Sequence, residues 1–269
     1  MSSVPEDGAR SPGRGPGGVG ARSRSGGRGL RVVSLVPSVT ETLLAWGLAP
    51  VGVTRWCEHP ELPALGGTKD PDIDAVRRLA PDLVIMCEEE NRREDADALE
   101  AAGVAVHALR VRSLADVGPE LATLAVRLGV GSRWSAPPLS AAPTRPAAGA
   151  ARRAFVPIWR QAARGPEPVT YTTLNDDTYG ASVLRALGVA NAYGDASDRY
   201  PTTTLDDAIG RAPDVVLAPS EPYPFGPRHV PELSCVAPVV LVDGQDLFWW
   251  GARTEAALAR LAASLEAAP

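Results

Sequence analysis

The stretch IDAVRRLAPDLVIMCEE at residues 73–89 decides the fold, because it recurs as LDDAIGRAPDVVLAPSE at residues 205–221. The two copies align without a gap at an offset of 132 residues and share an Ala-Pro-Asp triplet and a final glutamate. Upstream, ETLLAWGL at 41–48 aligns with SVLRALGV at 182–189 at an offset of 141, so the first copy carries nine extra residues between its two blocks. A repeat of this length predicts two similar structural units.

The flanking sequence alternates between strand and helix patterns. We expect strands at 31–36, 51–54, 83–87 and 104–109, helices at 39–46, 73–79, 93–102 and 114–128, and a second unit that begins with a strand at 154–159. Ser38 and Glu41 form a Ser-x-x-Glu capping box for the first helix, and Gly47 is its expected C-cap. This alternation predicts an α/β fold of two Rossmann-like lobes with parallel sheets. A ligand cleft is then expected between the carboxyl ends of the strands.

Composition divides the chain into four parts. Residues 1–30 are mostly Gly, Ser, Pro and Arg and predict a disordered tail. Residues 31–130 form the expected N-terminal lobe and residues 154–269 the C-terminal lobe. The segment 131–153 between them is rich in Pro and Ala, and its four prolines exclude a continuous helix, so we expect a linker or a broken helix there.

Charge, hydropathy and cysteine content exclude several classes of protein. The net charge of −5 and pI of about 5.3 argue against a nucleic-acid partner. No apolar run is long enough for a membrane span or a signal-peptide core, so we expect a cytoplasmic monomer, or a periplasmic one if the start is misassigned. The three cysteines form no CxxC pair, which excludes a zinc knuckle or a disulfide framework.

The loop VGVTRWCEHPELPALGGTKDPDID at residues 51–74 falls in the interval that holds the nine extra residues. It follows an expected strand, where α/β proteins place ligand contacts, and it brings Trp56, Cys57 and His59 together. Cys57 and His59, with His229 elsewhere, are candidate metal or axial ligands. A protein metal site needs three or four ligands, so aromatic surface led by Trp56 is the main expectation.

Several stretches, taken in order with the repeat, resemble the iron/cobalamin periplasmic-binding family. These are the two-lobed receptors for cobalamin, ferric siderophores and haem that serve ABC importers. The resemblance runs from residue 31 to the C-terminus and is greatest to the cobalamin-binding members. The stretches that carry it are VSLVPSVTETLLAWGL, PVGVTRWCEHP, LAPDLVI, LGVANAYGD, APDVVLAPSEP and FWWGART.

The resemblance implies two lobes joined by one long helix, with the ligand between them. It places Trp56 and Tyr200 against a corrinoid ring from opposite lobes. Adjacent side chains on extended backbone point in opposite directions, so one of Trp249 and Trp250 is expected to face the ligand while the other packs on its lobe. The late loop and the polar groups expected near the amide fringe of the ring comprise Phe248, Trp249, Trp250, Gly251, Arg253, Arg199 and Glu221.

The family also docks on its permease through one acidic residue on each lobe. Those positions fall on Asp74 and Asp206, which are equivalent in the repeat. Other members typically have Glu there, and Asp is shorter by one methylene. The alternative for both residues is a first-turn acid that complements a helix dipole.

The expected function is therefore non-catalytic binding of cobalamin or a related metal chelate, without a catalytic cofactor. The alternative is a siderophore, haem or metal-ion binder on the same scaffold. A corrinoid-handling enzyme is the third class, but the sequence has no nucleophile elbow, P-loop or Gly-x-Gly-x-x-Gly after a strand.

Overall fold

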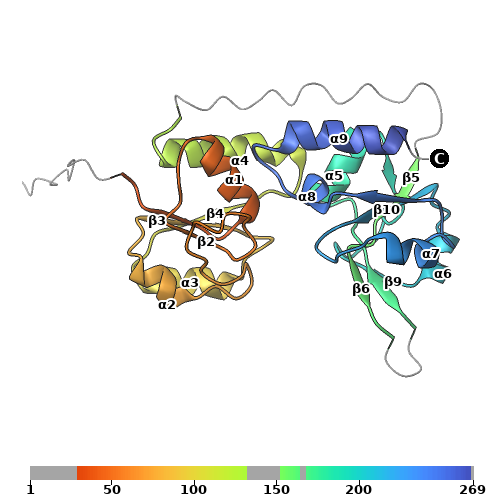
Figure 1. The fold of residues 1–269 in the computed structure, drawn as a ribbon, viewed down its shortest axis with the longest axis horizontal. Helices are drawn as coiled ribbons and strands as arrows, with labels where there is room; N and C mark the ends of the chain where they lie inside the picture. Colours follow the sequence, from red (N-terminus) through yellow and green to blue (C-terminus); the bar gives the residue numbers. More distant parts are fainter. Residues whose placement is uncertain (1–28, 132–151, 164–167, 268–269) are drawn as a thin grey trace, which may run out of the picture.

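The computed structural model describes residues 29–131, 152–163 and 168–267. These residues form two α/β lobes that lie side by side (Figure 1). The predicted fold class is confirmed, since each lobe is built on a parallel four-stranded sheet. The predicted N-terminal tail and most of the Pro-rich linker lie outside the described residues.

The first lobe has helices on both faces of its sheet. Helices α1 and α4 cover one face, and α2 and α3 cover the other (Figure 1). The apolar side chains of each pair belong to a separate hydrophobic cluster. The sheet runs in the order β2-β1-β3-β4, with bounds Gly52–Val53, Val32–Ser34, Leu83–Cys87 and Val106–Leu109. The helices are α1 (Pro37–Ala45), α2 (Ile73–Arg78), α3 (Arg93–Ala101) and α4 (Leu114–Arg127).

The second lobe repeats this arrangement and adds to it. Its parallel sheet runs in the order β11-β10-β5-β8, with bounds Val239–Val242, Val215–Pro219, Arg153–Phe155 and Ala190–Asn191. Helices α5, α8 and α9 cover one face, and α6 and α7 the other. The helices are α5 (Tyr179–Ala186), α6 (Leu205–Gly210), α7 (Val230–Leu233), α8 (Gly244–Phe248) and α9 (Thr254–Glu266).

A small antiparallel sheet in the second lobe was not predicted. The strand expected at 154–159 is interrupted near Pro157, and its end belongs to a different sheet. Proline has no backbone N–H to donate, which favours a break at this point. The small sheet consists of β6 (Trp159–Gln161), β7 (Thr170–Thr172) and β9 (Thr202–Thr203).

The internal repeat is visible in strand order and in hydrogen bonds. Strand order is the same in both lobes once β8, β5, β10 and β11 are matched to β2, β1, β3 and β4. The aspartate of each Ala-Pro-Asp triplet accepts a backbone N–H from the start of the neighbouring strand, Asp82 from Arg31 at 2.8 Å and Asp214 from Arg153 at 2.7 Å. The alanines at positions 80 and 212 both take a positive φ, of 44° and 48°.

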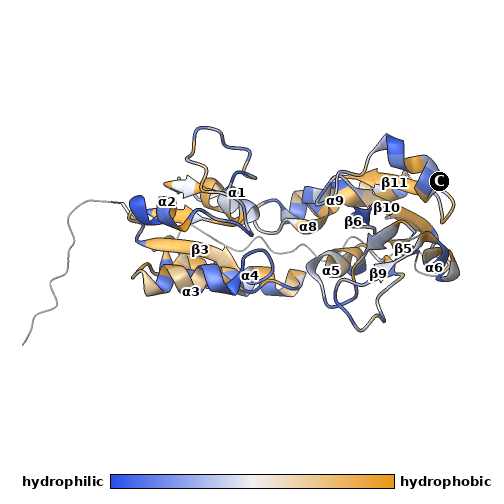
Figure 2. Cartoon of the chain, turned by 90° about the horizontal axis from the view of Figure 1, so that it is seen from below, coloured by the Kyte–Doolittle hydropathy of each residue, from blue (hydrophilic) through white to orange (hydrophobic). Residues whose placement is uncertain are grey.

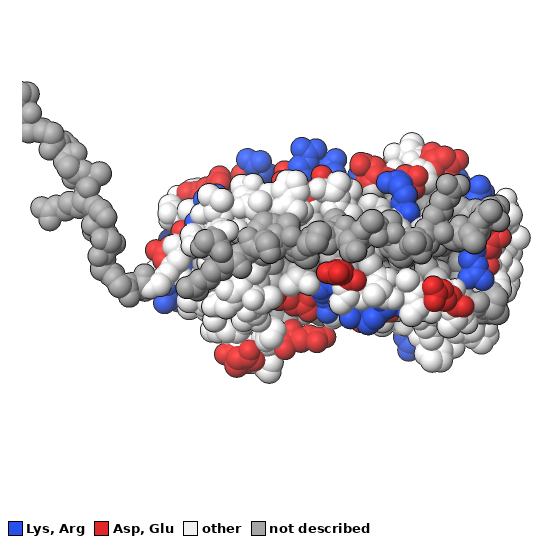
Figure 3. All heavy atoms as spheres, turned by 90° about the horizontal axis from the view of Figure 1, so that it is seen from above, with Lys and Arg blue, Asp and Glu red and all other residues white. Residues whose placement is uncertain are grey.

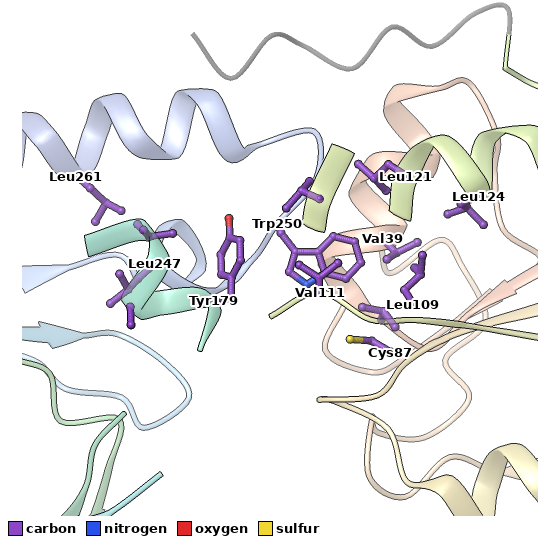
Figure 4. Close-up of a cluster of buried hydrophobic side chains, with 14 of the residues drawn as sticks. Val39, Cys87, Leu109, Val111, Leu121, Leu124, Tyr179, Leu247, Trp250 and Leu261 are labelled. Carbon is purple, nitrogen blue, oxygen red and sulfur yellow. The ribbon is translucent and has the colours of Figure 1, made fainter. Parts of the chain in front are cut away.

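One hydrophobic core runs through both lobes. Trp250 is 3% exposed at their junction, near Val39 and Val111 of the first lobe and Tyr179 of the second (Figure 4). Figure 2 shows strands β3, β10 and β11 as hydrophobic, and every residue of β3 and β10 is buried. The lobes are therefore held together by apolar burial as well as by polar contacts.

The start of α1 differs from the sequence-based prediction. The helix begins at Pro37, whose fixed φ suits the first helical position, and its N-cap Val36 makes no side-chain cap. Ser38 therefore lies inside the helix with its hydroxyl buried and unpartnered, so the predicted capping box is wrong. The C-cap is Trp46 rather than the predicted Gly47, which follows it with a φ of 77°, the left-handed conformation that glycine favours just after a helix.

The surface carries charges of both signs. Figure 3 shows acidic and basic side chains interspersed over the face it views. Within the described ranges, no helix has the length and apolar composition needed to cross a membrane.

Candidate functional site

The loops after the carboxyl ends of the strands meet between the two lobes. In the first lobe, Glu58 follows β2, Glu89 follows β3 and Arg112 follows β4. In the second lobe, Glu221 follows β10 and Gln245 follows β11. Polar contacts between the lobes join Glu58 to Gln245 (3.1 Å), Thr42 to Ala252 (3.1 Å), Glu41 to Arg253 (2.8 and 2.9 Å), Leu114 to Ser182 (2.9 Å), and Glu89 to Arg199 and Tyr200.

The loop that follows β2 presents Trp56 to solvent with 58% of the residue exposed. The Arg55 guanidinium lies over the indole, 5.2 Å from the ring centroid, and also pairs with Asp70 at 2.7 Å. A Cβ on Gly67 would lie 3.1 Å from the indole nitrogen, so glycine allows the loop to pack closely here. Trp56 is thus held from one side and leaves a large aromatic surface open.

Cys57 and His59 do not form a shared ligand pair. The Cys57 thiol lies 3.4 Å from the hydroxyls of Thr40 and Thr54, on the inner side of the loop. The His59 Nδ1 atom pairs with Glu61 at 3.1 Å. Among the residues that the structure describes, no group of three His, Cys, Asp or Glu side chains is arranged to hold a metal ion.

His229 lies within the packed interior of the second lobe. It is 6% exposed and makes edge contacts with the rings of Tyr223 and Phe225, at centroid distances of 5.5 and 5.3 Å. Its Nδ1 atom accepts a hydrogen bond from the Gly226 backbone at 3.1 Å. Burial and the neighbouring Arg228 lower the pKa of His229. These contacts remove it from the candidate axial ligands.

The late loop contains two tryptophans with different environments. Trp250 is part of the core between the lobes and is therefore withdrawn from ligand contact. Trp249 is half-buried, lies 5.0 Å from the Arg253 guanidinium and donates a hydrogen bond to Glu221. This difference follows the opposite orientation expected for adjacent side chains.

Gly251 and Phe248 of the same loop have packing roles. Gly251 has a φ of 115°, and a Cβ there would collide with the Thr42 hydroxyl of α1, so glycine is required for the lobes to approach. Phe248 is half-buried against Gly180 of α5, where a Cβ would lie 2.9 Å from the ring. Neither residue has a contact that assigns it to a ligand.

Arg253 is a structural cation between the lobes. It forms a two-point hydrogen bond with Glu41 and also lies 3.7 Å from the buried Asp246. Its side chain is 18% exposed, and one of its terminal nitrogens is buried without a hydrogen-bond partner. Two of its five N–H groups therefore bond Glu41, while the buried Nη1 atom keeps its donors unused.

Glu221 is a desolvated carboxylate at the carboxyl end of β10. Burial raises its pKa, and the charges of Asp243 and Glu58 act in the same direction. The hydrogen bond from Trp249 and the charge of Arg253 oppose that shift. Glu221 thus retains acceptor capacity in a region of negative potential.

Glu90 is a further carboxylate that the sequence analysis did not single out. Burial raises its pKa to about 7, with contributions from the charges of Glu221 and Glu89, while Lys69 opposes the shift. The interaction with Glu221 brings acidic groups of the two lobes into one electrostatic environment. The run of three glutamates directly after a predicted strand was the available sequence signal.

Glu89 has the opposite environment to that of Glu221, its equivalent in the repeat. It accepts a hydrogen bond from the Arg199 guanidinium and another from the Tyr200 hydroxyl at 3.1 Å. The Arg112 Nε atom lies 3.8 Å from the same carboxylate. Burial and the charge of Glu89 raise the pKa of Tyr200 to about 12. Sequence reasoning missed Arg112, whose only signal is its place just after a strand.

A separate pocket of about 360 Å³ lies in the first lobe between α3 and the β3–β4 edge. None of the predicted ligand-binding residues lines it. We assign the candidate site instead to the loops that follow β2, β3 and β4 in the first lobe and β8, β10 and β11 in the second, which we call the facing loops. These loops combine exposed aromatic surface with desolvated carboxylates. The pocket is lined by Met86, Cys87, Glu88, Asn91, Arg92, Arg93, Ala96, Glu100, Val106 and Ala108.

Asp74 and Asp206 lie on helices at the same position in each lobe. Each is the second residue of its helix, α2 or α6, and each is exposed. Asp74 also pairs with Arg77 at 3.2 Å. The two carboxylates are thus accessible and equivalent by the repeat.

The proteins that this chain is similar to include binding proteins for vitamin B12 and heme. No family model matches the chain. It is 22% identical over 204 residues to the vitamin B12-binding protein of Salmonella paratyphi A, covering 70% of this chain and 71% of the relative. Its fold matches BhuT, a periplasmic heme-binding protein solved with two hemes, with a TM-score of 0.69, 22% identity and coverage of 87% and 97%.

A second solved structure of similar fold is the periplasmic vitamin B12 binding protein BtuF of Vibrio cholerae. It matches with a TM-score of 0.67 and 21% identity over 88% of this chain and 96% of that one. This chain has the two-lobed periplasmic binding-protein fold. The resemblance drawn from the sequence motifs is confirmed by these matches.

The same matches correct the expectation about where in the cell the protein is located. We expected a cytoplasmic protein because the sequence shows no signal-peptide core, with a periplasmic protein as the alternative if the start is misassigned. The cytoplasmic expectation is wrong, because BhuT and BtuF, which match over 97% and 96% of their own length, are periplasmic binding proteins.

Proposed function

We propose that the chain is a non-catalytic binding protein for a corrinoid such as cobalamin. The ligand lies between a first lobe of residues 31–130 and a second lobe of residues 154–269, joined by residues 131–153. The relatives named as vitamin B12-binding proteins support this ligand class.

The observation that carries the proposal is the combination of aromatic surface and acceptor-rich carboxylates on the facing loops. Trp56 and Tyr200 are 58% and 46% exposed and come from different lobes. A corrin ring is broad and partly apolar, so aromatic faces can bury it. Its fringe of primary amides donates N–H groups, and carboxylate oxygens such as those of Glu58 and Glu221 accept hydrogen bonds.

A calorimetric and absorbance titration with cyanocobalamin tests the proposal. We expect saturable 1:1 binding by the wild-type chain and at least about tenfold weaker binding by Trp56→Ala, since ring burial is lost. Trp159→Ala is the matched control, because Trp159 is 47% exposed on β6, outside the facing loops. Lack of wild-type binding at high micromolar ligand would refute the proposal, and equal losses in both variants would refute the assignment of Trp56.

Haem is the second candidate ligand, supported by structural neighbours named as heme-binding proteins. The specific feature in its favour is Tyr200, because a tyrosine oxygen can ligate haem iron. The Tyr200 hydroxyl donates to Glu89, and its pKa of about 12 disfavours the phenolate form. A haemin titration decides this candidate: a charge-transfer band lost in Tyr200→Phe would support it.

A transport role requires a permease partner, and we propose Asp74 and Asp206 as the residues that contact it. Their exposure and their equivalence in the two lobes support a two-point docking surface. Replacing both with Asn is expected to abolish stimulation of a reconstituted importer while leaving cyanocobalamin binding intact. Full stimulation by the double variant would refute this docking surface.

A further inference from the structure

Glu89 fills a site built to hold a carboxylate. Arg199 donates to one of its oxygens, the Tyr200 hydroxyl donates to the other at 3.1 Å, and Arg112 Nε lies 3.8 Å away. The Arg112 and Arg199 side chains are 37% and 25% exposed, so both guanidinium groups are partly withdrawn from water. Donors that converge in this way from two lobes form an anion receptor.

The receptor has more donors than Glu89 satisfies. Arg112 Nε and Arg199 Nη2 are buried without a hydrogen-bond partner. Asp177 offsets part of the positive charge, with its carboxylate 3.3 Å from Arg199 Nε and 3.9 Å from Arg112 Nη1. With Glu89 and Asp177 both ionised, the two arginines are balanced. Removal of the Glu89 carboxylate would leave one net positive charge and free the Arg199 and Tyr200 donors.

The Glu89 carboxylate is held in place by its own chain. The Glu89 backbone carbonyl accepts a hydrogen bond from Lys69 Nζ at 2.9 Å, and the Glu90 N–H bonds back to Cys87 at 3.2 Å. An intramolecular group of this kind competes at a high effective concentration against any anion from solution. A ligand carboxylate must therefore displace Glu89 before it can reach Arg112, Arg199 and Tyr200.

We propose that Glu89 is a specificity-determining residue that excludes carboxylate-bearing tetrapyrroles from the site between the lobes. The inference rests on the proposed binding function and goes beyond it by naming the ligand class that is rejected. A ring with an amide fringe does not need the Arg112, Arg199 and Tyr200 donors, which Glu89 already occupies. The free carboxylates of another ring are repelled either by Glu89 or by the other acidic groups of the facing loops.

The experiment compares wild type, Glu89→Ala and Glu89→Gln in titrations with haemin and with haemin dimethyl ester. The ester keeps the ring and the iron but has no free carboxylate. We expect Glu89→Ala to bind haemin at least about tenfold more tightly than wild type and to show no such gain for the ester. Glu89→Gln removes the charge with less loss of packing and decides the question if the alanine variant does not fold.

Glu88→Ala is the matched control, because Glu88 is the preceding residue, its side chain is 51% exposed and it lies 3.6 Å from Arg110 instead. It is expected to leave haemin affinity unchanged. Unchanged haemin affinity in both Glu89 variants, or an equal gain for haemin and its ester, would overturn the inference. Cyanocobalamin binding by wild type is measured separately, so loss of the proposed function and loss of this inference are distinguishable.

Discussion

Glu89 and Glu221 occupy equivalent positions in the two lobes but have opposite surroundings. Each lies two residues beyond a buried central strand, β3 or β10. Glu89 is neutralised by Arg199 and hydrogen-bonded to Tyr200, whereas burial and nearby carboxylates raise the pKa of Glu221. The repeat thus places a glutamate at both positions. The neighbouring loops determine whether its carboxylate is already hydrogen-bonded within the protein or is free to accept hydrogen bonds from a ligand.

The largest expected effect comes from removing the cation that neutralises Glu89. Arg199→Ala leaves this carboxylate partly buried without its charged partner and is expected to destabilise the protein by about 2–3 kcal/mol. Urea denaturation at pH 7.5 measures the change. Arg185→Ala is the control, since its pair with Asp176 is 62% and 53% exposed at 3.6 Å and should contribute less than about 0.5 kcal/mol. Equal effects of the two substitutions would show that Glu89 is not preferentially paired.

The next effect tests the acidic environment around Glu221. The pKa of Glu90 is raised from 4.5 to about 7, so the folded state binds the additional proton and stability falls as pH rises between these values. Glu90→Gln should therefore raise stability by about 1–2 kcal/mol at pH 8, after allowance for residual solvent screening, and by much less at pH 5. Denaturation at both pH values measures it, and a gain independent of pH would contradict the electrostatic cause.

A smaller effect compares the two repeat-related acids directly. The charge of Glu221 raises the pKa of Glu90 more than that of Glu89 does. Glu221→Gln should therefore lower the titration midpoint of Glu90 more than Glu89→Gln does, because Arg199 already neutralises Glu89. Carboxyl-carbon NMR titration of Glu90 measures both shifts. A larger shift of the Glu90 midpoint in Glu89→Gln than in Glu221→Gln would contradict the different surroundings assigned to the two glutamates.

The smallest expected effect concerns the hydrogen bond that Glu221 accepts. Trp249→Phe removes the indole donor while keeping an aromatic ring, so the pKa of Glu221 should rise further above its usual range. The same NMR titration reports it, with Trp159→Phe as a control in a different part of the lobe. An unchanged Glu221 midpoint would show that the indole does not stabilise the ionised form.

Much of the fold was accessible from the sequence because the repeat encodes it locally. The Ala-Pro-Asp triplets lead directly into β3 and β10, and the expected alternation of strands and helices is observed in both lobes. The start of α1 was misjudged because Pro37 takes the first helical position ahead of Ser38. The small antiparallel sheet was missed because its strands are short and separated along the chain.

The candidate site was less accessible, because its properties arise from contacts between distant segments. Trp249 and Trp250 are adjacent, yet only the packing of α1 and α4 against the late loop determines which indole is buried. The contact between Glu89 and Arg199 joins residues 110 positions apart. No local pattern encodes such a pair, and burial of His229 likewise depends on rings that are not adjacent to it in sequence.

A crystal structure of the wild-type chain with cyanocobalamin is the most direct test of the central claim. We predict the corrin ring between the lobes, with Trp56 against it and an amide of its fringe within hydrogen-bonding distance of Glu221. Glu89 should remain on Arg199 and Tyr200. A ligand bound outside the facing loops, or one that displaces Glu89 from these donors, would contradict the account.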